Sequence, residues 1–302
     1  MGFKDYVLVR PDVLDPGYDD KLAPEIDEVV LGTAPIIYSD PVEFFKRTYP
    51  TQSIRIILEE IANVLREGSG RKIYPLVSLF GGGKTHTLLT IYHALRNPDK
   101  VSLIDPGLGE KYRGLERVDV ILVNGKTDSL APSPVTPLET GGPCIRTLWG
   151  YVAYKLGQYD VVREFDEKLQ APGRDVLRRI LSNRRVVVLV DEIGEYIKRI
   201  SASRMLGKYE YIDQVVLFID YLAEAIESTN NILLITFPIE AEANRIKSIQ
   251  EGYESIARTL REIFIRIFRV AGNVYAPVTG SEELYSVLRK RLFEKIDLDK
   301  AS

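Results

Sequence analysis

Short, continuous apolar runs alternate along the chain with stretches of helical spacing. The apolar runs predict buried strands at 73–80, 118–123, 185–190, 232–236 and 274–277. Helical spacing is found at 53–66, 144–156, 160–181, 209–228, 249–268 and 281–295. Strands that are apolar throughout and alternate with helices indicate a parallel sheet covered on both faces. The pattern therefore predicts a three-layer α/β/α sandwich with a mainly parallel, five-stranded sheet.

The first fifty residues do not show this alternation. Turn-forming pairs recur there at Pro11-Asp12, Pro16-Gly17 and Asp40-Pro41. Short elements joined by turns are therefore expected in this region, rather than one long helix.

A glycine-rich sequence joins the first strand to the helix that follows it. Residues 78–85 read SLFGGGKT, and glycines let backbone N–H groups wrap closely around a phosphate chain. The positive end of the following helix adds to that attraction. Lys84 is expected to reach the β- and γ-phosphates, and Thr85 to bind Mg²⁺. This is the P-loop pattern of an ATP-binding protein, although Ser78 stands where the general pattern has glycine. The residues expected to bind the nucleotide are Phe80, Gly81, Gly82, Gly83, Lys84, Thr85 and His86.

Two further strands end in polar residues that suit such a site. Strand 185–190 leads into Asp191 and Glu192, and open α/β sheets bind ligands at the carboxyl ends of their strands. Asp191 is expected to hold Mg²⁺ through water, and Glu192 to orient and deprotonate the attacking water. Thr236 ends the next strand and is the candidate contact to the γ-phosphate or that water; the alternative is a threonine that satisfies only local backbone groups. The expected catalytic residues are Lys84, Glu192 and Thr236.

Other charged and polar residues near these motifs have simpler interpretations. His86 directly follows Thr85, and packing or capping at the start of the helix is expected there rather than catalysis. Candidates for an arginine finger on a neighbouring subunit's ATP are Arg258, Arg261, Arg266 and Arg269. Solvated surface charge is the default role of these arginines, and only an oligomer contact would give one of them a catalytic role.

Composition limits the classes of partner. The chain has 302 residues and a formal net charge of −3, so no basic excess supports a sequence-wide grip on nucleic acid. Its single cysteine, Cys144, excludes an internal disulfide and fits a reducing interior. Residues 1–10 lack a signal-peptide pattern, and no run of about 18 uncharged apolar residues occurs. We therefore expect a cytoplasmic protein with no membrane partner.

Several short sequences carry a resemblance to one family. They are FFKRTYPT at 44–51, FGGGKTHT at 80–87, TLWG at 147–150, APG at 171–173 and VDE at 190–192. In this order they resemble the predicted AAA+ ATPases called the domain of unknown function 499 family. The resemblance covers nearly the whole chain, and the closing segment 276–293 shares it.

The resemblance implies an AAA+ ATPase within a longer, multidomain prokaryotic protein. It implies an N-terminal extension packed on the core over 1–50, a P-loop ATPase core over 51–278, and the first helix of an incomplete C-terminal lid over 279–302. Such proteins are often encoded near DNA methyltransferases or other phage-defence genes. DNA or a DNA-modifying protein is therefore an expected partner besides ATP and ADP, and a homo-oligomer is a further expectation.

The expected function is hydrolysis of ATP with Mg²⁺, coupled to remodelling of a partner protein or DNA complex. The alternative is a nucleotide-dependent scaffold or switch that binds ATP with little turnover, and Glu192 argues against it because a scaffold has no use for a base. A small-molecule kinase would need an acceptor pocket and a basic lid, of which the sequence has no sign. Transporter-type ATPases need an LSGG signature before the acidic strand, and this chain lacks it.

Overall fold

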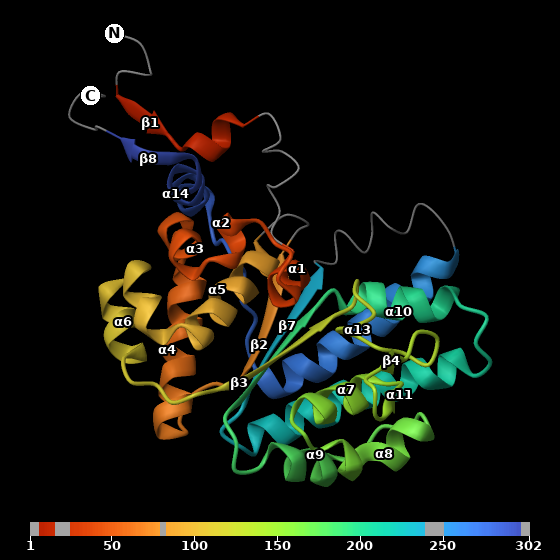
Figure 1. The fold of residues 1–302 in the computed structure, drawn as a ribbon. Coiled ribbons are helices and arrows are strands. Elements are labelled where there is room, and N and C mark those ends of the chain that lie inside the picture. The colour runs from red at the N-terminus through yellow and green to blue at the C-terminus, as the bar shows by residue number, and fades with distance from the viewer. Residues whose placement is uncertain (1–5, 16–24, 79–82, 239–250, 297–302) are drawn as a thin grey trace.

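A four-stranded parallel sheet lies at the centre of the computed structural model, which describes residues 6–15, 25–78, 83–238 and 251–296, without the side chains of 251–253. Its strands are β2 (Ile73–Ser78), β3 (Asp119–Asn124), β6 (Val186–Asp191) and β7 (Ile232–Pro238). Their order in space is β2-β7-β6-β3, and every neighbouring pair is parallel. Helices cover both faces (Figure 1), and the strands are buried along most of their length. The predicted α/β class and parallel sheet are therefore confirmed.

The predicted number of five strands is wrong for the described residues. Of the run 274–277, only Tyr275 pairs with the sheet, through a single parallel bridge to Leu76 on the outer side of β2. The amide of Val77 donates to the Tyr275 carbonyl at 2.9 Å, and the Tyr275 amide donates to the Pro75 carbonyl at 3.0 Å. Pro75 and Pro277 have no N–H to extend this ladder, which explains why the pairing stops after one residue.

One face of the sheet is covered by helices that flank the first strand. They are α4 (Gln52–Glu67), α5 (Lys84–Arg96) and α6 (Pro106–Tyr112), with a 3₁₀ turn, η4 (Pro98–Leu103), between the last two. The start and end of α4 follow from its sequence: the Thr51 hydroxyl accepts the Ile54 amide at 3.3 Å, and Gly68 ends the helix with a left-handed φ of 72°. Its buried face carries the apolar residues whose spacing predicted a helix at 53–66.

The other face is covered by the longer helical part of the chain. It comprises α7 (Leu148–Lys155), α8 (Tyr159–Glu167), α9 (Arg174–Leu181), α10 (Ile193–Ala202), α11 (Lys208–Glu227) and α13 (Glu251–Ala271). The single helix predicted at 160–181 is two helices, because Leu169 takes a left-handed φ of 56° and Pro172 interrupts the pattern. The helical spacing predicted from residue 144 begins instead with β5 (Cys144–Ile145), which pairs with β4 (Leu138–Glu139).

The two ends of the chain meet beyond the sheet. β1 (Val7–Val9) pairs antiparallel with β8 (Phe293–Ile296), which directly follows α14 (Ser281–Leu292) (Figure 1). The last helix therefore ends at Leu292 and not at the predicted residue 295, because the chain becomes a strand that pairs with the N-terminal segment. The remaining N-terminal elements are η2 (Pro11–Leu14), α1 (Ile26–Leu31), α2 (Ile36–Ser39) and α3 (Pro41–Arg47).

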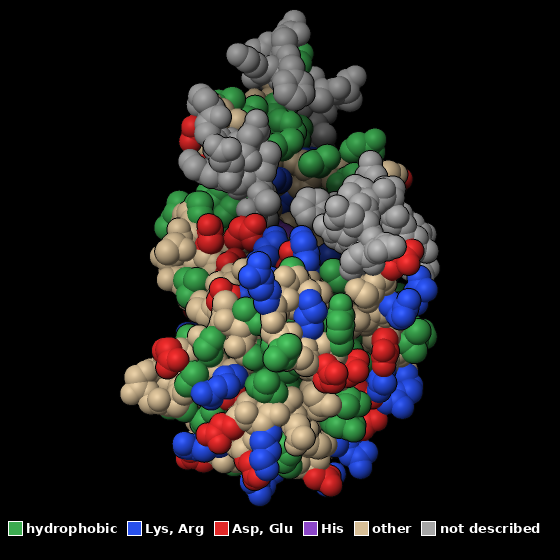
Figure 2. Space-filling model, turned by 90° about the vertical axis from the view of Figure 1, so that its right-hand side faces the viewer, with side chains coloured by type: hydrophobic (Ala, Val, Ile, Leu, Met, Phe, Trp, Pro, Cys, Tyr) green, Lys and Arg blue, Asp and Glu red, His purple; other side chains and the backbone are tan. Residues whose placement is uncertain are grey.

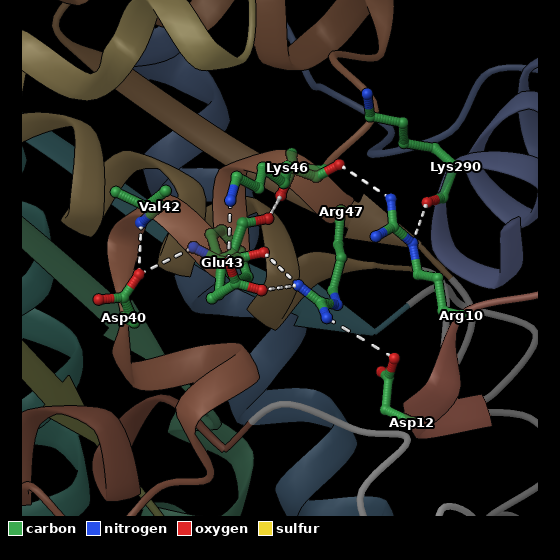
Figure 3. A network of polar contacts seen from close by, with 10 residues as sticks. Arg10, Asp12, Asp40, Val42, Glu43, Lys46, Arg47 and Lys290 are labelled. Carbon is green, nitrogen blue, oxygen red and sulfur yellow. Dashed lines mark hydrogen bonds and ion pairs between the residues drawn. The ribbon is translucent and has the colours of Figure 1, made fainter. Parts of the chain in front are cut away.

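Polar contacts fasten the N-terminal segment between α3 and α14. Figure 3 shows the Arg10 guanidinium donating to the carbonyls of Lys46 and Lys290, each at 3.3 Å. In the same view, Arg47 lies 3.6 Å from Asp12 and pairs with Glu43 on its own helix. One short segment thus joins two helices that are more than two hundred residues apart in the sequence.

The surface carries charges of both signs. On the face in Figure 2, Lys and Arg side chains are interspersed with Asp and Glu, and one group of Lys and Arg side chains lies near the middle of the view. This distribution agrees with the small net charge of −3. No helix among the described residues has both the length and the apolar character needed to cross a bilayer.

Candidate functional site

The carboxyl ends of the sheet strands bring three predicted site residues into direct contact. The Thr85 hydroxyl donates to one carboxylate oxygen of Asp191 at 2.9 Å, and the Thr236 hydroxyl donates to the other at 2.6 Å. Since β7 lies between β2 and β6, Thr236 stands on the strand that separates β2 from Asp191, the acid that ends β6. Asp191 and Thr236 are only 2% and 4% exposed, so this cluster is sheltered from bulk water.

The turn into α5 positions the predicted phosphate-binding lysine. Gly83 caps the helix with a left-handed φ of 86°, a conformation that would be strained for a residue with a side chain. Its carbonyl accepts hydrogen bonds from the amide and the hydroxyl of Thr87. The Lys84 ammonium group donates to the Ser78 carbonyl at 2.8 Å and lies 3.3 Å from the Ser78 hydroxyl. Ser78, the departure from the general pattern, therefore contributes a hydroxyl contact to Lys84 that glycine would lack. Three predicted nucleotide contacts, Phe80, Gly81 and Gly82, lie outside the described residues.

The predicted base, Glu192, takes a conformation that is unusual for its residue type. Its φ of 52° and ψ of 39° are left-handed, and it is the single residue between the end of β6 and the start of α10. The Lys126 ammonium group lies 3.5 Å from the Glu192 carboxylate and 3.8 Å from that of Glu25. A Cβ at Gly125 would lie 1.9 Å from the Glu192 carbonyl oxygen, so only glycine fits beside this turn.

The environment of Glu192 suits proton transfer. Burial raises the pKa of its carboxyl, the nearby charge of Asp191 raises it further, and Lys126 acts in the opposite direction. Burial tends to lower the pKa of Lys126, but the Glu192 and Glu25 carboxylates outweigh that effect and the net pKa is raised. A carboxylate with a raised pKa accepts a proton more readily near neutral pH.

Sequence reasoning missed Gly125, Lys126 and Glu25. The polar run that starts at Asn124, directly after predicted strand 118–123, is the one local sign of a functional turn there. This polar run follows the carboxyl end of β3, which is the end of the sheet where ligands bind. That β3 lies next to β6, and so brings the run close to Glu192, follows only from the strand order in the structure.

The His86 side chain contacts the residues at the end of α3. Its ring centroid lies 4.8 Å from that of Phe44, and its Nε2 atom is hydrogen-bonded to the Thr48 hydroxyl at 3.3 Å. Burial, and then the charge of Arg291, lowers the pKa of His86 to about 3, so the ring is neutral at physiological pH. These contacts agree with the packing role expected at the helix start, while a contact between His86 and nucleotide stays a prediction.

Two of the candidate finger arginines, Arg266 and Arg269, pair with a buried carboxylate. Arg266 and Arg269 lie 2.8 and 2.9 Å from the two carboxylate oxygens of Asp220, which is 7% exposed on α11. These ion pairs join α13 to α11. The other two candidates, Arg258 and Arg261, lie nearer the start of α13, and a finger role for any of the four stays a prediction.

The TLWG motif, which carried part of the family resemblance, builds the core and not the site. The Thr147 hydroxyl caps α7 by accepting the Gly150 amide at 3.0 Å, and it also donates to the buried carboxylate of Asp166. Trp149 is fully buried and packs against the rings of Tyr211 and Phe218. These contacts fix the helices that support β3 and β6 from one face.

A family model described as the DUF499 N-terminal domain matches residues 1–274. A search of curated proteins found no match. Among solved structures, the ORC2 protein of Aeropyrum pernix, determined as ADPNP–ADP complexes, is similar at 16% sequence identity and a TM-score of 0.35. That similarity covers 80% of this chain and 52% of the ORC2 chain, so this chain spans about half the length of that structure.

Proposed function

We propose that this chain, which belongs to the DUF499 family, binds ATP with Mg²⁺ and hydrolyses it to ADP and phosphate. The observation that carries the proposal is the pair of hydrogen bonds from Thr85 and Thr236 to Asp191. Three polar side chains from three separate segments meet there, beside a glycine turn that opens a helix. This is the combination that phosphate and Mg²⁺ recognition require.

Lys84 and the turn before it would bind the phosphate chain. The turn at Gly83 directs the start of α5, with its positive dipole end, toward the carboxyl edge of the sheet. The ammonium group of Lys84 already lies at the end of β2, and a phosphate oxygen would compete with Ser78 for it. A charge-assisted contact to phosphate is stronger than the present contact to a neutral carbonyl.

Thr85 and Asp191 would hold Mg²⁺. Their side chains supply hard oxygen atoms 2.9 Å apart, and the hydrogen bond between them can give way to a shared cation. In the described parts of the chain, Asp191 contacts hydroxyl groups but has no basic side chain within 4 Å. Those parts also contain no group of three or more His, Cys, Asp or Glu side chains arranged for a metal. When bound, the ion would neutralise charge on the transferring phosphate.

Glu192 and Thr236 would act on the attacking water. The water oxygen attacks the γ-phosphorus, the bond to the bridging oxygen of ADP breaks, and Glu192 accepts the proton that the water releases. Its raised pKa favours that acceptance. Thr236, which is hydrogen-bonded to Asp191, would orient the water or the γ-phosphate with its hydroxyl.

We extend the proposal to an AAA+ ATPase with three parts. These are an N-terminal extension at 1–50, an ATPase core at 51–278 and the first helix of a lid at 279–302. The lid assignment is supported by α14, which lies beyond the sheet and is anchored there by Glu283, whose carboxylate accepts the Gln52 amide at 2.7 Å. The work coupled to hydrolysis would be remodelling of a partner protein or DNA complex, in keeping with the family resemblance.

The test is magnesium-dependent binding and hydrolysis of ATP by the purified chain. Wild type should release phosphate, and Lys84→Ala should bind ATP at least about tenfold more weakly because a charge-assisted contact is lost. Glu192→Gln should bind normally but turn over about 10²- to 10⁴-fold more slowly. Lys100→Ala is the matched control, since the ion pair of Lys100 within the described residues is with exposed Asp99.

Each alternative outcome has its own meaning. Wild type that binds ATP but releases no more phosphate than Glu192→Gln would favour the scaffold function instead. Wild type that binds no nucleotide would contradict the proposal as a whole. Melting temperatures of all variants should accompany the assays, so that loss of activity is not mistaken for loss of folding.

A further inference from the structure

The helix proposed above as the start of a lid, α14, is held in place without a buried apolar face. None of its residues, all of which the structure describes, is buried, and its apolar side chains Leu284, Tyr285 and Leu288 are 46%, 69% and 44% exposed. Most helices in proteins are stabilised by packing of an apolar face, and α14 lacks that packing. Its position therefore depends on contacts at its two ends.

The beginning of α14 lies beside the candidate phosphate-binding turn. The Glu283 carboxylate accepts the amide of Gln52, the first residue of α4, at 2.7 Å. Just before α14, Pro277 lies so close to the turn that a Cβ added to Gly83 would be 3.4 Å from the Pro277 Cβ. Because this end is next to the proposed nucleotide site, movement at the other end of α14 would change access to the site.

The other end of α14 is bound by one arginine from the opposite end of the chain. The Arg10 amide donates to the Leu292 carbonyl at 3.0 Å, and the Arg10 guanidinium donates to the Lys290 carbonyl at 3.3 Å. The last four carbonyls of a helix have no partner within the helix, and a cation is favourable at their negative dipole end. Arg10 therefore satisfies two such carbonyls and supplies the positive charge.

The same guanidinium also binds the end of a second helix. Figure 3 shows it donating to the carbonyl of Lys46, in the last turn of α3, at 3.3 Å. The next residue of α3, Arg47, lies 3.6 Å from Asp12, two residues after Arg10. Arg10 thus joins the ends of α3 and α14, and Asp12 adds a second link to α3.

The strap, which we define as residues 7–14 with β1, Arg10 and η2, is attached weakly enough to be released. No residue of β1 or η2 is buried, and β1 forms three register pairs with β8. An isolated pair of short strands is marginally stable in water, and segments with few buried apolar contacts open most easily. Release of the strap should therefore require much less free energy than unfolding of the core.

We propose that the strap holds α14 against the ATPase core, with Arg10 as the positioning residue that fastens it, and that release of the strap speeds the departure of nucleotide from the site. The first part rests on the contacts of the strap alone. The second part rests on the ATPase function proposed above. The N-terminal segment would then regulate nucleotide exchange through contacts that lie outside the nucleotide site.

Arg10→Met removes the guanidinium but keeps the backbone groups that pair β1 with β8. Hydrogen exchange of the α14 and β8 amides, measured without nucleotide, should become about three- to tenfold faster, the scale of one or two lost hydrogen bonds at a partly exposed site. Release of ADP that carries a fluorescent N-methylanthraniloyl group, measured by stopped flow, should quicken by a similar factor. Arg10→Lys keeps the charge but lacks the planar fork that spans two carbonyls, so its rates should lie between those of Arg10→Met and wild type.

Arg66→Met is the matched control. The Arg66 guanidinium also donates to two backbone carbonyls, those of Lys111 and Arg113, but it lies near the end of α4 that is farther from the site. Its loss should lower stability by a comparable amount. Exchange of α14 and β8 and release of the labelled ADP should nevertheless equal those of wild type.

A reversible crosslink tests the opposite change. Leu8 and Lys295 are register partners in β1 and β8, and paired Cα atoms of antiparallel strands lie at about 4.5–5.5 Å, a separation that a disulfide spans. Cys144 is the one native cysteine, so the pair Leu8→Cys/Lys295→Cys is made in a Cys144→Ser background. Oxidation should slow release of the labelled ADP about two- to fivefold, because the strap can no longer leave β8, and reduction should restore the parent rate.

Different results would overturn each part. Unchanged exchange of α14 and β8 in Arg10→Met would show that the strap does not hold α14. Faster release in Arg66→Met, equal to that in Arg10→Met, would show a general loss of stability instead. Faster exchange with unchanged release, in Arg10→Met and in the oxidised crosslinked variant alike, would overturn the link to the site. If wild type binds neither ADP nor ATP, the proposed function fails and the second part fails with it, whereas the exchange of α14 still decides the first part.

Discussion

The central sheet uses polar side chains differently at its amino edge, where the parallel strands begin, and at its carboxyl edge, where they end. At the amino edge, the fully buried Asn231 accepts the Val186 amide at 2.7 Å and donates to the Leu181 carbonyl at 2.9 Å. There, Arg185 donates to the Leu65 carbonyl at 3.0 Å. At the carboxyl edge, by contrast, Asp191 is bound by two hydroxyl side chains.

This difference separates structural from functional polarity. A side chain that satisfies buried backbone groups cannot leave without exposing them unpaired, which costs about 1–3 kcal/mol for each group. A hydroxyl–carboxylate pair can exchange its partner for a metal ion or phosphate without that cost. A large groove does not by itself indicate a functional edge. The amino edge has a groove of about 850 Å³, yet Arg66 in its wall is already bound to the carbonyls of Lys111 and Arg113.

The largest effect is expected from Asp191→Asn at the carboxyl edge. The neutral amide can no longer hold a cation, and several kcal/mol of charge stabilisation correspond to a turnover about 10²-fold lower or more. The melting temperature should change little. Asp119→Asn, at the start of β3, is the control and should retain full turnover, because the Asp119 carboxylate lies 3.5 Å from Arg184 at the amino edge, away from the site. Equal losses in the two variants would remove the distinction between the edges.

Asn231→Leu should show the reverse pattern. The substitution leaves buried backbone groups unpaired, so the free energy of unfolding should fall by about 2–4 kcal/mol in denaturant titrations. Turnover per folded molecule should stay near that of wild type. The neighbouring Asn230 is exposed, and Asn230→Leu should leave stability nearly unchanged. Normal stability for Asn231→Leu would show that this edge tolerates unpaired groups.

Gly125→Ala tests the close contact between the turn after β3 and the base. The added Cβ would overlap the Glu192 carbonyl oxygen, so the turn must shift, at about 1–3 kcal/mol of stability. We expect turnover to fall about tenfold as Glu192 is displaced. Gly173→Ala is the control, because a Cβ there meets nothing within 4 Å. Full turnover in Gly125→Ala would mean that the position of Glu192 is not set by this contact.

The smallest expected effect is a pH dependence of stability that arises from His93, a buried residue of α5. Burial is the main reason why the pKa of His93 is lowered, and its Nε2–H donates to the Tyr38 carbonyl at 2.7 Å. The unfolded chain therefore binds a proton near pH 6.5 that the folded chain resists, so stability should fall as the pH drops below that value. His93→Gln can keep the donor and should show a weaker fall in melting temperature between pH 7 and pH 5. Equal slopes would contradict the assignment.

The sequence by itself determined the fold class and supplied the prediction of most candidate-site residues. Each of the four strands of the sheet overlaps an apolar run that is visible in the sequence, because a strand buried on both faces needs continuous apolar residues. Lys84, Thr85, Asp191 and Glu192 could be predicted because each stands directly after a strand or a glycine turn. Local spacing carries that information and needs no knowledge of the neighbouring strands.

Only the tertiary structure decided which residues surround those groups. Glu25 and Lys126 lie about a hundred residues apart, and their meeting beside Glu192 depends on the order of the strands and on α1 packing against the turn after β3. The pairing of β1 with β8 likewise joins the two ends of the chain and shortens the last predicted helix. The predicted fifth strand is a single bridge at Tyr275, because Pro75 in the neighbouring strand β2 and Pro277 have no N–H to extend the pairing. Such contacts between distant segments depend on how whole elements pack, and no local pattern of residues encodes them.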